Sequence, residues 1–179
     1  MFRAGSTGTA VLIAGGYTTT HVSVTESWNG SAWTEVNDLN VAKGTLAGGG
    51  TYTSAITGGG QAAPGYTTDS ESWNGTNWTE VSEINNVRGY GAGDGSSNTN
   101  ALIFGGNTPP PATSANTESW DGSSWTEVND LATARGNGMG GAGTNTLALA
   151  FGGNSTAQTA VTEEWAFGGL PPSTPAADY

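Results

Sequence analysis

Three basic residues recur at equivalent places along the chain, and their charge makes them the first candidates for chemistry. Lys43, Arg88 and Arg135 are three of the four Lys and Arg residues, and each precedes a glycine-rich stretch. A ring of such cations could bind an anion. Alternatively, each cation pairs with a repeated glutamate between neighbouring sheets. The candidate glutamates are Glu26, Glu71 and Glu118. We favour the structural role, because packing contacts recur in every unit of a repeat protein and buried ion pairs can set register.

Aromatic side chains are the second candidates, because a flat ring can stack on the apolar face of a sugar. Two sets of tryptophans recur in phase: the first is Trp28, Trp73 and Trp120, and the second is Trp33, Trp78 and Trp125. Their periodicity predicts that the second set is core between sheets. The first set lies beside a tight turn and stays open to ligand binding, as do two tyrosines in loops of variable sequence, Tyr17 and Tyr66.

Little else in the chain predicts catalysis. His21 is the only histidine, and with no cysteine nearby or elsewhere it has no partner at metal-ligand spacing. The carboxylates recur with the repeat and do not single out one acid–base pair. No Gly-x-Ser-x-Gly nucleophile motif and no calcium-binding loop occurs. We therefore predict a protein that is not an enzyme and has no metal and no cofactor.

The charge balance excludes some classes of partner. The chain has 15 Asp and Glu residues against 4 Lys and Arg, a formal net charge of −11. Nucleic acids and anionic membranes require clustered cations, so neither is an expected partner. No apolar run approaches the ~20 residues of a membrane helix. The absence of cysteine also excludes a disulfide framework.

These residues belong to a repeat that organises nearly the whole chain. The first tryptophan of each unit stands at positions 28, 73, 120 and 165, so successive units are 45, 47 and 45 residues apart. A glycine doublet runs in phase, as Ile13-Ala-Gly-Gly16, Ile56-Thr-Gly-Gly59, Ile103-Phe-Gly-Gly106 and Ala150-Phe-Gly-Gly153. A period of this length indicates an array of supersecondary units that bury their apolar faces against one another.

Each unit reads as four short strands, and no stretch has apolar residues at helical spacing. The best-defined pair is the tryptophan hairpin. A two-residue turn at Asn29-Gly30 predicts that Trp28 pairs with Ser31 and Glu26 with Trp33. Because side chains alternate along a strand, the glutamates and tryptophans of this hairpin share one face.

With these marks the chain resembles the kelch-type β-propellers: a glycine doublet after an apolar strand, a tryptophan on the fourth strand, and a basic residue before the next glycine-rich strand. The resemblance implies four-stranded antiparallel blades around a central channel. The motif Trp-Asn-Gly-x-x-Trp departs from the usual Tyr and Trp of that family, and Ser119-Trp-Asp-Gly-Ser-Ser-Trp125 is also similar to the Asp-box of sialidase-type propellers. The Thr/Asn/Gly-rich composition resembles repeats of bacterial and phage surface proteins, which favours an extracellular, cell-surface or virion location.

The repeat marks divide the chain into about four blades within residues 1–169. Their approximate limits are 1–42, 43–87, 88–134 and 135–169, followed by an extended tail at 170–179. We expect the first blade to lack most of its first strand and the last blade to lack its fourth. Closed kelch-like propellers usually have six to eight blades, so we expect a homodimer that closes a ring of seven or eight. The alternatives are a four-bladed ring or a piece of a longer protein.

The leading functional hypothesis is a non-catalytic module for binding or display. The connections between the glycine doublet and the tryptophan hairpin differ in sequence while the blades are nearly identical, at 17–25, 61–70, 107–117 and 154–162. Such variable loops suggest a surface that meets a protein or glycan partner, although drift in unconstrained loops gives the same pattern. One alternative is a lectin with repeated sugar sites between blades. A propeller enzyme is another, but it would need a copper-ligand set or an arginine cluster.

Overall fold

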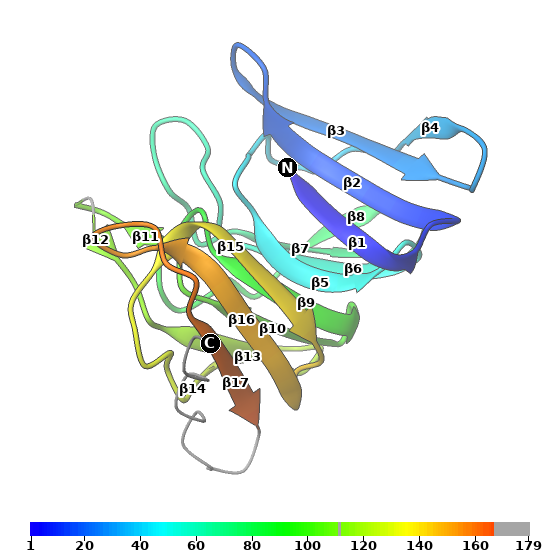
Figure 1. Ribbon diagram of the computed structural model, residues 1–179. Helices are drawn as coiled ribbons and strands as arrows, with labels where there is room; N and C mark the ends of the chain where they lie inside the picture. The colour runs from blue at the N-terminus through cyan, green and yellow to red at the C-terminus, as the bar shows by residue number, and fades with distance from the viewer. Residues whose placement is uncertain (111, 167–179) are drawn as a thin grey trace.

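The computed structural model of the chain describes residues 1–110 and 112–166, and over these residues the fold is all-β with no helix (Figure 1). Four antiparallel sheets follow one another along the chain and form the four blades of a β-propeller. Blade 1 contains β1 (Phe2–Thr7), β2 (Ala10–Tyr17), β3 (His21–Trp28) and β4 (Trp33–Val36). Blade 2 contains β5 (Ala47–Thr51), β6 (Ser54–Gly58), β7 (Ser70–Trp73) and β8 (Trp78–Val81).

The other two blades vary this plan. Blade 3 contains β9 (Ala92–Ser97), β10 (Asn100–Phe104), β13 (Thr117–Trp120) and β14 (Trp125–Val128). A small hairpin of β11 (Asn107–Thr108) and β12 (Ala112–Thr113) extends the connection between its second and third strands. Blade 4 contains β15 (Gly136–Gly143), β16 (Leu147–Asn154) and β17 (Thr162–Ala166). Each main strand pairs with the next main strand of its blade, so every blade is a meander.

The first and last blades were predicted to be incomplete, and the structure contradicts this prediction for blade 1. The prediction that blade 1 lacks most of its first strand is wrong, because β1 is a six-residue strand with Phe2 opposite Ala14 of β2. The repeat explains this strand, because aligning Gly15 with Gly105 places Phe2 on Ala92, where β9 begins. Blade 4 has three strands within the described residues. The predicted tail, 170–179, lies outside them.

The tryptophan hairpin has a longer turn than predicted. Trp28 lies directly opposite Trp33, and Glu26 opposite Glu35, so four residues rather than two form the turn. The Asn29 side chain caps it by accepting backbone N–H bonds from Ser31 and Ala32, both at 3.0 Å. The pairing differs from the prediction by two residues, an even number. The glutamates and tryptophans therefore still share one face, as predicted.

Three apolar clusters hold the blades together, one between each pair of consecutive blades. Between blades 1 and 2, Phe2 and Leu12 pack with Trp73 and Trp78. The same arrangement recurs between blades 2 and 3, and between blades 3 and 4, where Leu102 and Phe104 meet the alanines of β16. No single blade encloses a core of its own, which is the expected physics of a repeat array.

The glycine doublet marks where each blade meets the connection into the next. The equivalent pair in blade 2 is Gly59-Gly60 rather than Gly58-Gly59, because Gly59 and Gly105 share a left-handed backbone, with φ of 67° and 62°. The shift shows that the sequence alignment of this marker was one residue out in the second unit.

Candidate binding surface and the repeated ion pairs

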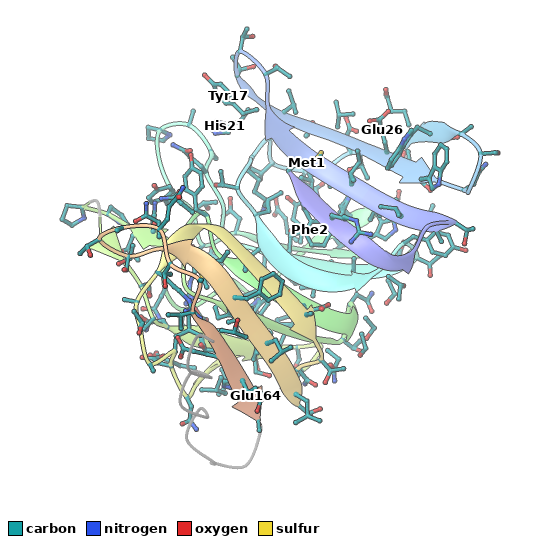
Figure 2. All side chains as sticks on the ribbon, in the orientation of Figure 1. Met1, Phe2, Tyr17, His21, Glu26 and Glu164 are labelled. Atoms are coloured by element: carbon teal, nitrogen blue, oxygen red, sulfur yellow. The ribbon has the colours of Figure 1, made fainter. Side chains whose placement is uncertain are left out.

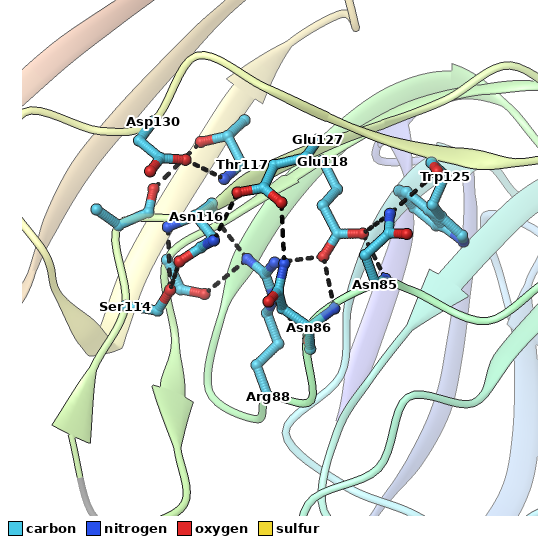
Figure 3. Close-up of polar contacts among 12 residues, drawn as sticks. Asn85, Asn86, Arg88, Ser114, Asn116, Thr117, Glu118, Trp125, Glu127 and Asp130 are labelled. Atoms are coloured by element: carbon cyan, nitrogen blue, oxygen red, sulfur yellow. Dashed lines mark hydrogen bonds and ion pairs between the residues drawn. The ribbon is translucent and has the colours of Figure 1, made fainter.

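Each of the three recurring cations is buried and paired within the blade that it enters. Lys43 Nζ lies 3.3 Å from Glu71, Arg135 lies 3.1 Å from Glu163, and Arg88 makes the same pair with Glu118 (Figure 3). Burial lowers the pKa of Lys43 and Arg88, and the partner glutamate opposes that shift. Side chains buried in this way do not present an anion-binding ring to solvent.

The ion pairs also connect consecutive blades. The carboxylate of Glu118 accepts the backbone N–H of Asn85, at 2.7 Å, from the segment that leaves blade 2. The carbonyl of Arg88 in turn accepts the N–H of Gly60 of blade 2, at 2.8 Å. Equivalent bonds join Asn40 to Glu71 at 2.7 Å and Ala132 to Glu163 at 2.6 Å. We call this unit the bracket: a buried cation, its partner glutamate, and the backbone bonds that both make to the preceding blade. It positions each new blade on the one before it.

The first of the predicted glutamates behaves differently from the others. Glu26 is half-buried in β3, and within the described part of the chain no cation lies in ion-pairing reach of it. The partner of Arg135, Glu163, is not among the predicted glutamates. Its signal was present in the partial repeat Thr162-Glu-Glu-Trp165, where aligning Trp165 with Trp120 places Glu163 on Glu118.

Whether a tryptophan is buried depends on its blade rather than on its position in the hairpin. Trp73 and Trp120 are buried, so their rings are not available to a ligand and they leave the list of candidates. Their indole N–H groups bond backbone carbonyls, Trp73 to Tyr52 and Trp120 to Asn98. Trp28 is half-buried and makes a similar bond to Gly8.

The second tryptophans are core in blades 2 and 3 but not in blade 1. Trp78 and Trp125 are each 5 % exposed, whereas Trp33 is 46 % exposed. The tryptophan and the Thr-Glu-Val that follows it are the same in all three hairpins. The difference therefore comes from the blade that covers Trp78 and Trp125 and is missing beside Trp33.

Connections that differ in sequence gather on one side of the molecule, which we call the loop face (Figure 1). They are the connections between β2 and β3, β6 and β7, β10 and β13, and β16 and β17. The first of them is shorter than predicted, because β2 extends to Tyr17 and β3 begins at His21. The tight β1–β2 and β3–β4 turns project away from this face.

Exposed aromatic rings lie on the loop face. Tyr17 and His21 meet edge to face at the tip of the β2–β3 hairpin, with ring centroids 5.2 Å apart (Figure 2). Tyr66 makes a similar contact with Tyr90, at 6.2 Å. Tyr90 is not among the predicted site residues. It lies two residues after Arg88, and Thr45 and Asn137 lie at the same offset from Lys43 and Arg135. All three have a left-handed backbone, so the offset marks an equivalent position in each unit. Tyr66 lies in the β6–β7 connection and Tyr90 in the connection from β8 to β9 beside it, so together they form a surface that neither connection forms alone.

A groove of about 560 Å³ runs along the inner strands of all four blades. It is lined largely by glycine backbone, with Arg3 and Asp94 as its charged side chains. Asp94 is already engaged with the backbone N–H groups of Gly95 and Gly143, both at 2.7 Å. Over residues 1–110 and 112–166, no group of three or more His, Asp or Glu side chains is placed to hold a metal ion.

Comparison with known proteins gives no family assignment. No protein-family model matches the chain, and no curated protein matches it significantly. The kelch resemblance therefore stays a prediction, and the propeller architecture rests on the structure. Among the residues that the structure describes, no helix has the length and apolar character needed to cross a membrane.

Proposed function

We propose that this chain is a non-catalytic binding module that recognises a protein or glycan partner through its loop face. One observation carries the proposal: near-identical blades, fixed to each other by the same buried bracket, present four connections of different sequence on one side. Rigid scaffolds that carry variable loops are a common way to build recognition surfaces.

The Tyr66–Tyr90 pair of the loop face is the part best suited to contact a partner. Tyr90 is 37 % exposed, and Tyr66 packs against it with its ring held at 88°. Tyrosine offers a large contact area at low entropic cost, together with a hydroxyl for hydrogen bonding. The same pair can stack on a sugar or fill a shallow pocket in a protein.

A lectin with repeated sugar sites between blades is less well supported. The spaces between blades are filled by the three apolar clusters, in which Trp73 and Trp120 are covered. A glycan ligand would therefore bind at the loop face, through loops that differ from blade to blade. We expect such binding to be selective for one structure rather than repeated at equivalent sites.

The test is a glycan array and a protein microarray, both probed with the labelled chain. We expect binding that is lost in the double variant Tyr66→Ala/Tyr90→Ala. It should be kept in the control Tyr52→Ala, which removes an exposed tyrosine from the β5–β6 turn. Inhibition by a free monosaccharide would identify a glycan partner. Binding that survives the double variant but not the control would overturn the assignment to the loop face, as would two silent arrays.

A further inference from the structure

Each blade has two distinct faces. The leading face packs on the preceding blade and carries the second tryptophan of the hairpin, and the trailing face packs on the next blade. At the contacts between blades 1 and 2 and between blades 2 and 3, that tryptophan donates its indole N–H to a hydroxyl across the interface. Trp78 donates to Thr25 and Trp125 to Ser70, each at 3.0 Å. The contact is therefore the same each time, one indole from the leading face and one hydroxyl from the trailing face.

Within residues 1–110 and 112–166, nothing packs on the leading face of blade 1. Trp33, in the position of the buried Trp78 and Trp125, is 46 % exposed. Beside it, Val11, Ile13 and Trp28 line a shallow apolar hollow. Their equivalents in blade 3, Ala101, Ile103 and Trp120, are buried against blade 2. The hollow is thus one half of the repeated interface, presented to solvent.

Blade 4 has the opposite half, a trailing face with nothing packed on it over the described residues. Leu149 and Phe151 are 38 % and 43 % exposed. Their equivalents in blade 3, Leu102 and Phe104, are buried to 0 % and 1 % exposure. The hydroxyl position follows the same pattern, because Thr162 is exposed whereas its counterparts are buried. These counterparts are Thr25, Ser70 and Thr117.

We propose that a second copy of this chain docks the trailing face of its blade 4 on the leading face of blade 1. The repeat indicates the occupant. The apolar contact present three times within the chain leaves one half exposed at each end of the series of blades, and these two halves carry the apolar and hydroxyl positions of the interior contacts. In the docked pair Trp33 donates to Thr162 of the second copy, as Trp78 does to Thr25. Leu149 and Phe151 of the second copy then cover the hollow.

Two copies satisfy both ends at once. In this structure the two free faces lie at opposite ends of the series of blades, so blade 4 does not cover blade 1 of its own chain (Figure 1). A two-fold axis makes the second contact identical to the first, so that the ring closes with eight blades and no face left over. The inner groove then becomes half of a central channel that is built from both chains.

Solution mass by light scattering tests the proposal across a concentration series. We expect about 36 kDa, which is twice 17.9 kDa. The single variants Trp33→Glu and Phe151→Glu, each with an unchanged circular dichroism spectrum, should both have the mass of one chain. Mixing them should restore a heterodimer, because one carries an intact trailing face and the other an intact leading face. Tyr52→Glu, a charge added at an exposed tyrosine outside both faces, should keep the wild-type mass.

Two results would overturn the proposal. A wild-type chain that stays at 17.9 kDa at every concentration would mean that the chain covers its own faces or leaves them open. A dimer that persists in both glutamate variants would mean that the copies meet elsewhere. A variant that fails to fold would be identified by its spectrum, and the milder Trp33→Ser and Phe151→Ser variants would then replace the pair.

Discussion

At the scale of single residues, Arg88 shows why a charge is placed inside this fold. Its guanidinium reaches Glu118, the carbonyls of Gly105 and Asn116, and the carbonyl of Asn86. These groups come from β13 of blade 3, from both ends of the connection between β10 and β13, and from the segment that enters the blade. One planar side chain with several donors can thus fix the position of all of them.

A double-mutant cycle on Arg88 and Glu118 measures this role. Removing one partner leaves a buried charge without its counter-ion, so Arg88→Met and Glu118→Leu should each cost about 3–5 kcal/mol in the free energy of unfolding. The double variant should cost much less than the sum, because neither charge remains. Urea unfolding of the four proteins gives the coupling. Additive losses would show that the two side chains act independently.

We expect the turn residue Asp121 to make the stability of the fold depend on pH in the acid range only. Hydrogen bonds from Ser124 and Ser123 lower the pKa of Asp121 below its ordinary value of 3.8. A carboxyl with a depressed pKa adds stability above 3.8 that is lost as the pH falls through the folded-state pKa. Asp121→Asn should remove that dependence while it preserves the turn, since Asn29 and Asn74 cap the equivalent turns. Thermal unfolding of both proteins from neutral to acid pH checks it, and parallel curves would contradict it.

At the scale of elements, the glycine doublet decides how closely one blade follows another. Gly105 has φ of +62°, and an added Cβ would meet the carbonyl of Arg135. Gly105→Ala should therefore cost about 1–3 kcal/mol in unfolding free energy, through backbone strain and that close approach. Gly65→Ala is the matched control, because a Cβ there meets nothing within 4 Å. Equal losses in the two variants, measured by urea unfolding, would contradict the explanation.

The sequence predicted the elements better than their registers. The repeated pair of tryptophans predicts one hairpin per blade, and β3–β4, β7–β8 and β13–β14 form it in blades 1, 2 and 3. The hairpin register was wrong because Asn-Gly indicates a two-residue turn, whereas here the Asn29 side chain closes a four-residue turn. Such a side-chain cap depends on the conformation that it stabilises, so the residue pair alone does not reveal it.

At the scale of the whole molecule, the tryptophan period predicts the number of blades, but it does not predict which blades have their apolar faces covered. Trp33 and Trp78 stand in nearly identical segments, and only the presence of a preceding blade buries Trp78. Burial between repeats depends on neighbours far away in sequence. A local pattern therefore predicts which face is apolar but not whether that face is covered. For the same reason Trp73 and Trp120 were wrongly retained as ligand candidates.

Interior and end blades should differ in how strongly their amides are protected from hydrogen exchange, because they have different numbers of neighbouring blades. The interior blades pack on both faces and the end blades on one, so in a single chain the amides of β6 and β10 should exchange most slowly. Those of β2 and β16 should exchange faster. The measurement is best made on the Trp33→Glu variant, in which a second copy does not mask the difference. Uniform protection along the chain would contradict a stability built from contacts between consecutive blades.

The bracket around each cation also makes the chain extensible. The carbonyl of Arg88 holds the glycine doublet behind it while its side chain holds Glu118 ahead, and Arg135 does the same one blade later. A cassette running from 89 to 135 thus contains both halves of every contact that it needs. Recombination between the near-identical copies could add or delete such a cassette without inventing a new interface. Adding or deleting a cassette would then change the number of blades while the contact between consecutive blades stays the same.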